Sequence, residues 1–119
     1  MTRSLSASRL NDYLGCPHQS ALWLAGVSPN AAPDPTLELI RERGFEHEAV
    51  VLKQLEYAIG PAISIPVDGA MPSRVDATLQ AIKAGASLIY QGALVHGDWL
   101  GLPDFLIRTT AAEGAAYIP

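Results

Sequence analysis

This sequence of 119 residues has a single cysteine, no long hydrophobic run and no excess of positive charge. Its single cysteine, Cys16, can form no disulfide within the chain, which is typical of a protein from a reducing compartment. No apolar run is long enough to cross a bilayer, and the N-terminus lacks the hydrophobic stretch of a secretory signal. We therefore expect a cytoplasmic protein that makes no contact with a membrane.

The charge balance is also informative. Eight Lys and Arg residues face twelve Asp and Glu residues, which gives a net charge of −4, and the cations are scattered along the chain. A domain that binds nucleic acid by itself usually carries a basic patch, so the charge argues against that class. A nuclease is not excluded, because acidic metal ligands lower the net charge of such a protein. With 49% hydrophobic residues, the chain has enough apolar material for one small domain with a core.

The first half of the chain predicts three helices. Ser6 is a good N-cap for a first short helix, and Pro17 suits the first turn of a second one. Residues 27–35 contain three prolines and predict a loop. An Asp-Pro start signal at the end of this loop predicts a longer helix over residues 36–57.

One face of this longer helix carries the first candidate functional residue, His47. The residues of this face recur at spacings of three and four, so we expect His47 to face inward. Glu48 lies off this face and makes a poor metal ligand. Gly44 precedes His47 by one turn, and a glycine inside a helix costs about 1 kcal/mol relative to alanine. A close approach by another group would explain it. The series is Leu37, Ile40, Gly44, His47, Val51 and Leu55.

The second half predicts a helix and several strands. Residues 62–67 predict a short strand that Pro66 restricts to an edge, and Ser73 with Asp76 resembles a capping box that would open a helix ending at Gly85. This helix is expected to present one face made of Val75, Leu79 and Ile82.

A hairpin follows this helix. Its strands are predicted over residues 87–95 and 99–108, joined by a turn at 96–98. A polar turn is expected from Thr109 to Gly114, and Tyr117 with Ile118 opens a third strand that is cut off.

Asp104 lies in the return strand of this hairpin, among apolar residues on both faces. An ionised carboxylate in such a place needs a partner or a cation, and Pro103 predicts a kink beside it because proline cannot donate a ladder hydrogen bond. An imidazole nitrogen with a carboxylate oxygen suits Mg²⁺ or Mn²⁺, which can generate hydroxide and polarise a phosphate. Two ligands are too few, so at least one further carboxylate is needed.

Simpler interpretations remain open for the same residues. A single helical histidine such as His47 is more often structural than a metal ligand, and Asp104 could bond turn amides or an arginine. Gln91 could bridge strands or reach a substrate, with the structural role favoured. Trp23, Tyr13 and Trp99 fit packing better than base stacking.

Three segments in this order resemble the RecB-family nucleases, which belong to the PD-(D/E)xK, or restriction-endonuclease-like, superfamily. They are Gly44-x-x-His47-Glu48, Tyr90-Gln91-Gly92-Ala93-Leu94, and Gly101-Leu102-Pro103-Asp104-Phe105-Leu106-Ile107-Arg108. The opening Leu5-Ser6-Ala7-Ser8 and Tyr13-Leu14-Gly15-Cys16-Pro17-His18 look like the start of the group related to CRISPR-associated exonucleases. The resemblance covers nearly the whole chain, and its strength lies in the order and spacing of short motifs.

The resemblance implies an α/β fold with a restriction-endonuclease-like core, made of N-terminal helices plus a β-hairpin and truncated before the third core strand. Residues 1–119 would be the N-terminal part of a single nuclease domain, with a helical leader over 1–34 and a partial nuclease core over 35–119. His47 would match the helical metal-binding histidine of the family and Asp104 the metal-binding aspartate. No role for Gln91 is implied.

The implied function is metal-dependent hydrolysis of DNA phosphodiesters in repair or recombination, with Mg²⁺ or Mn²⁺ at His47 and Asp104. The third family motif, an acidic residue and a lysine on the next strand, has no match here, so we expect these 119 residues to be inactive alone. The implied partners are DNA and a helicase or second nuclease domain in the same full-length chain.

Cys16 carries a separate implication. Some members of the family hold a [4Fe–4S] cluster with one N-terminal cysteine, often in a Cys-Pro pair, and three cysteines near the C-terminus. Cys16-Pro17 matches the first of these, and the other three are not in this sequence. The alternative is a buried structural thiol, since free cysteine is commonly buried.

Two further functions compete with the nuclease. One is a nuclease-like domain without catalysis that serves as a scaffold or DNA-binding module, for which the third motif would be degraded. The other is a small α/β binding module with accidental motifs, in which His47 and Asp104 would not converge.

Overall fold

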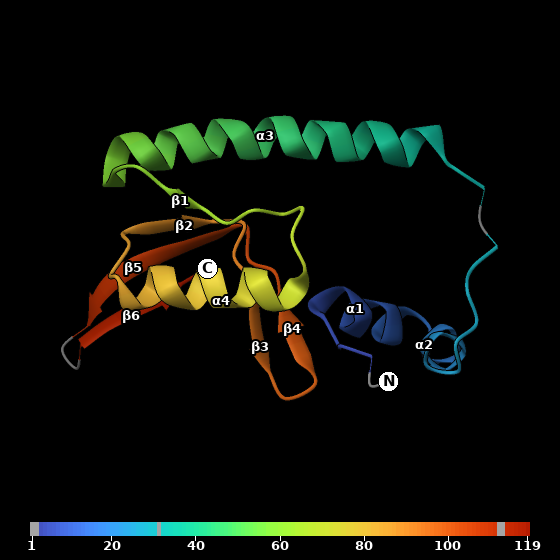
Figure 1. Ribbon diagram of the computed structural model, residues 1–119. Helices are drawn as coiled ribbons and strands as arrows, with labels where there is room; N and C mark the ends of the chain where they lie inside the picture. Colours follow the sequence, from blue (N-terminus) through green and yellow to red (C-terminus); the bar gives the residue numbers. More distant parts are fainter. Residues whose placement is uncertain (1–2, 31, 112–113) are drawn as a thin grey trace. The chain divides into compact units, whose positions relative to one another are not determined.

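The computed structural model describes residues 3–30, 32–111 and 114–119 (Figure 1). They form a mixed structure of helices and strands, which confirms the α/β class at this general level. The chain divides into two compact units, one of Met1–Asp34 with Val95–Gly101 and the other of Pro35–Leu94 with Leu102–Pro119. The first division falls where the predicted helical leader ends, whereas the hairpin segment 95–101 was not assigned to that leader.

The first unit contains two short helices, α1 (Ala7–Gly15) and α2 (Pro17–Leu24). The hydroxyl of Ser6 accepts a hydrogen bond from the Arg9 amide at 3.4 Å, so the predicted N-cap is confirmed. Pro17 is the first residue of α2, a position where its fixed φ and missing N–H cost nothing. Both helix starts were therefore readable from local sequence.

A two-stranded sheet adds to this unit through residues 95–101. Its strands are β3 (Leu94–His96) and β4 (Trp99–Gly101), and Gly97 in the turn has a φ of +58°. The backbone of Leu5 extends this sheet, because its amide donates to Asp98 O and its carbonyl accepts from the Leu100 amide, each at 2.7 Å. The predicted turn is confirmed, while the predicted long strands on either side of it are not.

The second unit is built on a four-stranded sheet of order β1-β2-β5-β6. β1 pairs parallel to β2, and the pairs β2–β5 and β5–β6 are antiparallel, with Ile89 opposite Leu106 at the centre. The strands are β1 (Ile63–Ser64), β2 (Leu88–Tyr90), β5 (Phe105–Ala111) and β6 (Gly114–Ile118). β1 lies at an edge, as Pro66 requires.

β6 corrects two predictions. Truncation before the third core strand is wrong, because β6 follows β5 and pairs with it from Gly114 to Ile118. The polar turn from Thr109 to Gly114 is also wrong in part, since Thr109, Thr110 and Ala111 belong to β5. Residues 112 and 113 of the predicted turn lie outside the described residues. Threonine has high strand propensity, and this outweighs the polarity that suggested a turn.

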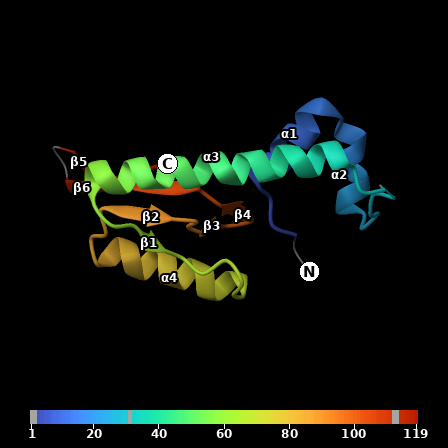
Figure 2. The same cartoon turned by 90° about the horizontal axis from the view of Figure 1, so that it is seen from above.

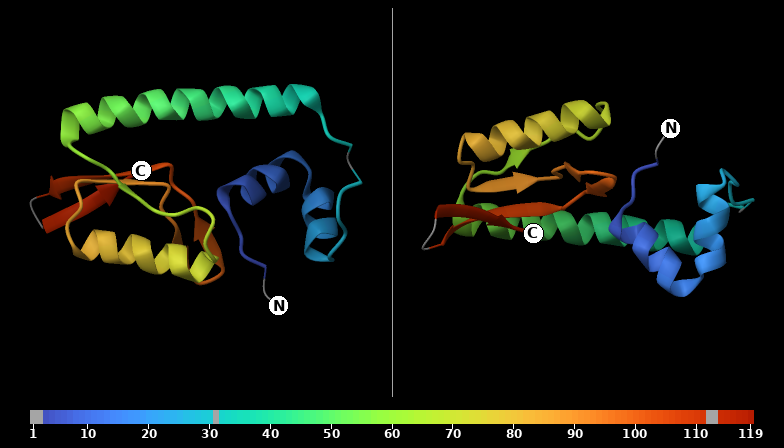
Figure 3. Two further views of the ribbon diagram at one scale, coloured as in Figure 1. Left: turned by 45° about the horizontal axis from the view of Figure 1, so that its top comes forward. Right: turned by 90° about the horizontal axis from the view of Figure 1, so that it is seen from below.

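Two helices cover opposite faces of this sheet, α3 (Pro35–Ile59) and α4 (Met71–Lys83), as Figures 2 and 3 show. The core against α4 is a buried cluster of Ile65, Ala81, Ile89 and Leu106. In the described part of the chain, no helix combines the length and the apolar character needed to cross a membrane.

α4 departs from the prediction at its start and in its buried face. Its N-cap is Ala70, without a side-chain hydrogen bond, so the capping box is wrong. Pro72 in the first turn fixes a helical φ two residues earlier than expected. Thr78 and Ala81 are the buried residues of α4, whereas Leu79 is 42% exposed.

α3 is rotated relative to the predicted face. His47 is exposed, and the half-buried series begins at Glu48 and continues through Val51, Leu52 and Leu55. The helix contacts β2, and these apolar residues of its C-terminal half set the angle. Since one residue corresponds to about 100° of helix rotation, this small shift turns His47 outward and Glu48 toward the sheet.

Gly44 also differs from its interpretation. A methyl group at this position would meet no atom within 4 Å among the described residues, and the φ of Gly44 is not positive. The predicted close approach is therefore wrong, and no contact in the described structure requires glycine here.

We expect Gly44→Ala to raise the free energy of unfolding by about 0.5–1 kcal/mol, because alanine loses less backbone entropy in a helix and nothing obstructs its methyl group. Urea unfolding followed by circular dichroism measures this change. A loss of stability would mean that a group contacts Gly44 in the folded protein.

Candidate functional site

Gln91 forms hydrogen bonds with three different parts of the second unit. It follows β2, and its φ of +60° is the one positive value among the described residues other than glycine. Its amide donates to Asp104 O at 2.8 Å, its carbonyl accepts from Arg74 Nη2 at 3.3 Å, and its side-chain amide donates to Glu48 Oε1. Gln91 thus joins α3, α4 and the segment before β5.

The left-handed backbone of Gln91 explains why the predicted strand over 87–95 breaks in two. A side chain in this region costs roughly 1–2 kcal/mol, and such residues persist where the surrounding structure holds them. The three hydrogen bonds supply that restraint. Thr78 adds to it from α4, because its hydroxyl donates to Arg74 O at 2.8 Å and accepts from the Ala93 amide at 3.0 Å.

Asp104 lies in the break between β4 and β5, directly before Phe105 opens β5. The kink predicted from Pro103 is confirmed. The prediction of an aspartate inside a strand that is buried on both sides is wrong, because Asp104 is exposed. The cost of burial alone therefore cannot argue for a metal at this residue.

Glu48 is the site residue that sequence reasoning missed. It is half-buried, it accepts from Gln91, and it lines one hollow of about 540 Å³ together with Asp104. The sequence signal that could have identified Glu48 is the helical spacing of positions 48, 51, 52 and 55, which are half-buried in the structure. That series competes with the predicted one, which has equally good helical spacing and two further apolar residues at its N-terminal end.

The pKa values show that the two carboxylates interact. The pKa of Asp104 is raised, first because neighbouring atoms remove water from it and then because Glu48 repels its negative charge. The pKa of Tyr90 is raised as well, chiefly because its hydroxyl hydrogen-bonds to Glu48, with loss of hydration as the second cause. Two negative groups therefore face the same space, and a cation between them would lower the energy of both.

His47 lies in the lining of the same hollow as Glu48 and Asp104, on the exposed side of α3. Across the described ranges, no set of three or more His, Cys, Asp or Glu side chains is close enough to hold one metal ion. The structure thus brings Glu48 and Asp104 into electrostatic contact and leaves His47 at the rim, so its inward orientation is a wrong prediction.

This donor set can be compared with the two predicted cofactors. Mg²⁺ is commonly bound by one or two carboxylates together with substrate phosphates and several water molecules. Glu48 and Asp104 are therefore ligands of the type that Mg²⁺ takes. A [4Fe–4S] cluster does not fit, since it takes four thiolates and Cys16 is the single cysteine. The buried structural thiol is wrong too, because Cys16 is exposed.

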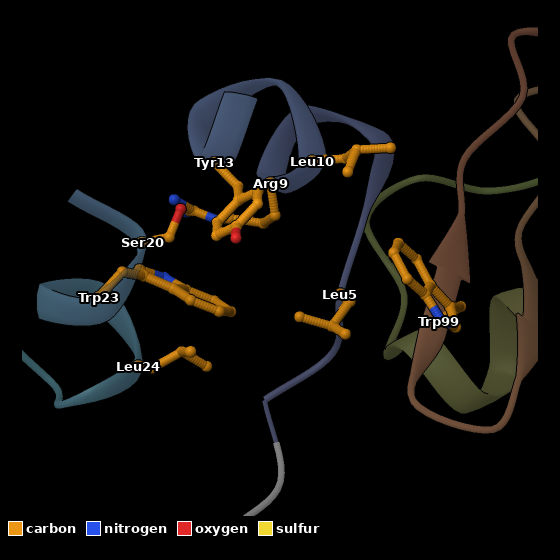
Figure 4. Close-up of a pocket in the computed structure, with 8 residues that line it drawn as sticks. All are labelled: Leu5, Arg9, Leu10, Tyr13, Ser20, Trp23, Leu24 and Trp99. Carbon is orange, nitrogen blue, oxygen red and sulfur yellow. The ribbon is translucent and has the colours of Figure 1, made fainter. Parts of the chain in front are cut away.

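A separate apolar pocket of about 180 Å³ lies in the first unit (Figure 4). The guanidinium of Arg9 lies 4.4 Å from the centre of a Trp23 ring, so Trp23 packs as predicted. Tyr13 and Trp99 are 53% and 48% exposed, which is more than the predicted packing role implies. None of the candidate metal ligands lines this pocket.

No protein-family model matches the sequence, and no curated protein or solved structure matches it either. The residues of this chain and their geometry are therefore what indicates its function.

The backbone of Gln91 generates a prediction with an unusual sign. We expect Gln91→Gly to be more stable than Gln91→Ala by about 1 kcal/mol, because both lose the bond to Glu48 and only glycine adopts a φ of +60° freely. Urea unfolding of both variants measures the difference.

Gln54 provides the matched control, since it is exposed in α3. There Gln54→Gly should be less stable than Gln54→Ala by about 1 kcal/mol, the normal order in a helix. The same order at both glutamines would show that residue 91 is not left-handed in solution.

Proposed function

We propose that this chain is part of a metal-dependent nuclease of the RecB-like, restriction-endonuclease-like type, which hydrolyses DNA phosphodiesters in repair or recombination. The observation that carries the proposal is the meeting of Glu48 and Asp104 at one hollow, where the charge of Glu48 raises the pKa of Asp104. A divalent cation is the natural partner of such a pair. The order of the sequence motifs supports the same assignment.

In this proposal Glu48 and Asp104 hold Mg²⁺ or Mn²⁺, and His47 reaches it from the rim of the hollow. The ion would activate a water molecule and neutralise charge on the phosphate. The side-chain amide of Gln91 orients the Glu48 carboxylate, and the backbone amide of Gln91 holds the Asp104 carbonyl. The Tyr90 hydroxyl supplies a second hydrogen bond to Glu48.

The proposed site needs more than these residues provide. An acidic residue and a lysine that orients the nucleophile would have to come from outside the 119 residues, as would three further thiolates for a [4Fe–4S] cluster with Cys16. From the sequence we also propose that the protein is cytoplasmic and that a helicase or second nuclease domain belongs to the same full-length chain.

One observation favours a second function, a nuclease-like scaffold or DNA-binding module without catalysis. The described residues contain no set of three metal ligands, and a degenerate nuclease would have this character. The two functions differ in whether the carboxylate pair binds a divalent cation tightly enough to act on DNA.

Cation binding tests the proposed site directly. We expect Mn²⁺ to bind the 119-residue chain, and Glu48→Gln and Asp104→Asn each to weaken binding by about tenfold or more, because each removes one of two charged ligands. Isothermal titration calorimetry measures the affinity. His47→Ala should weaken it less, since His47 lies at the rim.

The control is Glu46→Gln, which removes the same charge from an exposed position on α3. It should leave the affinity unchanged. Equal affinities for all four variants and the parent chain would refute the metal site. The product of the whole reading frame should then be assayed on DNA with Mn²⁺, where cation binding without cleavage would favour the scaffold.

A further inference from the structure

Arg74 is a cation that the proposed site does not use. It lies in the first turn of α4, half-buried, and its Nη2 donates to the Gln91 carbonyl at 3.3 Å. Its Nε is buried and has no hydrogen-bond partner among the described residues. A half-buried guanidinium with a long bond to one neutral carbonyl is poorly satisfied, since arginine has five donors and a permanent charge.

No carboxylate compensates this charge in the described part of the chain. The ion pairs found there join Arg9 to Asp12 and Arg41 to Glu38. Asp104 lines the same cavity as Arg74, yet among the described residues no ion pair joins the two side chains. Arg74 therefore does not act as the counterion of Asp104.

The cavity next to Arg74 connects it to the carboxylate pair. This hollow of about 650 Å³ is lined by Arg74, Gln91 and Asp104, among others, and Phe45 and Asp104 also line the hollow that contains Glu48 and His47. Asp104 thus stands between the two hollows, with carboxylates on one side and an uncompensated guanidinium on the other. Such an arrangement suits a ligand that binds a cation at one end and presents oxygen anions at the other.

We infer that Arg74 binds a phosphate of the substrate strand beside the Glu48–Asp104 pair. The inference rests on the proposed function, because the two carboxylates would repel a phosphate unless a divalent cation lay between them. A guanidinium presents paired donors to phosphate oxygens, which gives both charge and orientation. A contact of this kind is made with the backbone and carries no base specificity.

The probe is a short fluorescein-labelled oligothymidylate at constant Mg²⁺, with binding to the 119-residue chain followed by anisotropy over a range of KCl concentrations. We expect Arg74→Gln to weaken binding and to reduce the slope of log K against log salt by about 0.7, the value for one contact to a single strand. Arg74→Lys should keep most of the slope, because the charge remains. An oligodeoxyadenylate should show the same loss.

Lys83→Gln is the matched control, since Lys83 is an exposed cation in the last turn of the same helix. Its slope should equal that of the parent chain. An unchanged slope in Arg74→Gln, or an equal reduction in Lys83→Gln, overturns the inference, as does a parent chain whose oligothymidylate binding is absent or independent of salt.

The two hypotheses can fail separately. Mn²⁺ affinity is measured on the same samples, and Arg74→Gln should retain it. Loss of slope without any Mn²⁺ binding contradicts the metal site and overturns the inference as stated, because the phosphate would then bind without a cation beside the carboxylates. Mn²⁺ binding with an unchanged slope retains the metal site and overturns the phosphate contact alone.

A readout without a destabilising variant covers the case in which Arg74→Gln fails to fold. The Arg74 Nε–Hε signal of the ¹⁵N-labelled parent chain, assigned by its loss in Arg74→Lys, should shift when oligothymidylate is added. Inorganic phosphate at the same anion concentration should shift it less, because it lacks the strand's additional contacts. A signal that stays in place on adding oligothymidylate overturns the inference.

Discussion

The polar side of the second unit depends on one strained residue. Gln91 must leave β2 with a left-handed backbone for its amide, carbonyl and side chain to reach three different elements. In a regular strand the backbone amide and carbonyl of Gln91 would form ladder hydrogen bonds instead, and the Asp104 carbonyl and Arg74 would lose their hydrogen-bond partner. The local cost of roughly 1–2 kcal/mol is thus offset by hydrogen bonds that exist only because the strand is broken.

The Glu48–Asp104 pair also carries an energetic cost, and in this case the cost is electrostatic. At the hollow that Glu48 and Asp104 share, the pKa of Asp104 is raised, because neighbouring atoms exclude part of its water and the charge of Glu48 repels its own. The presence of two acids there is understandable if a bound cation removes the repulsion, which is the basis of the functional proposal.

Sequence patterns predicted the features that depend on residues within a few positions of each other. The starts of α1 and α2, the long helix, the kink at Pro103 and the turn at Gly97 all follow from proline, glycine and capping residues within a few positions. The orientation of α3 does not, because two overlapping helical series differ by one residue and only packing against β2 chooses between them. His47 was therefore placed inward and Glu48 dismissed, although they are neighbours in the chain.

Gln91 could not be predicted for a similar reason. Nothing in Tyr90-Gln91-Gly92 requires glutamine to be the left-handed residue when a glycine follows it, and the choice depends on Thr78, which is fully buried and contacts Ala93. A Cβ at Gly92 would lie 3.3 Å from a Leu106 methyl group and 3.4 Å from one of Thr78, so any larger residue there would crowd both side chains. Long-range packing thus assigned one glycine to close contact and gave the unusual backbone to its neighbour.

The two edges of the four-stranded sheet differ in how they would meet another strand. The β1 edge is two residues long and is followed by Pro66, which removes a donor and blocks extension. The β6 edge is five residues long, Gly114-Ala-Ala-Tyr-Ile118, without a charge or a proline. Such an edge is an open template for pairing, so at high concentration copies of these 119 residues will tend to associate through β6 unless another strand covers it.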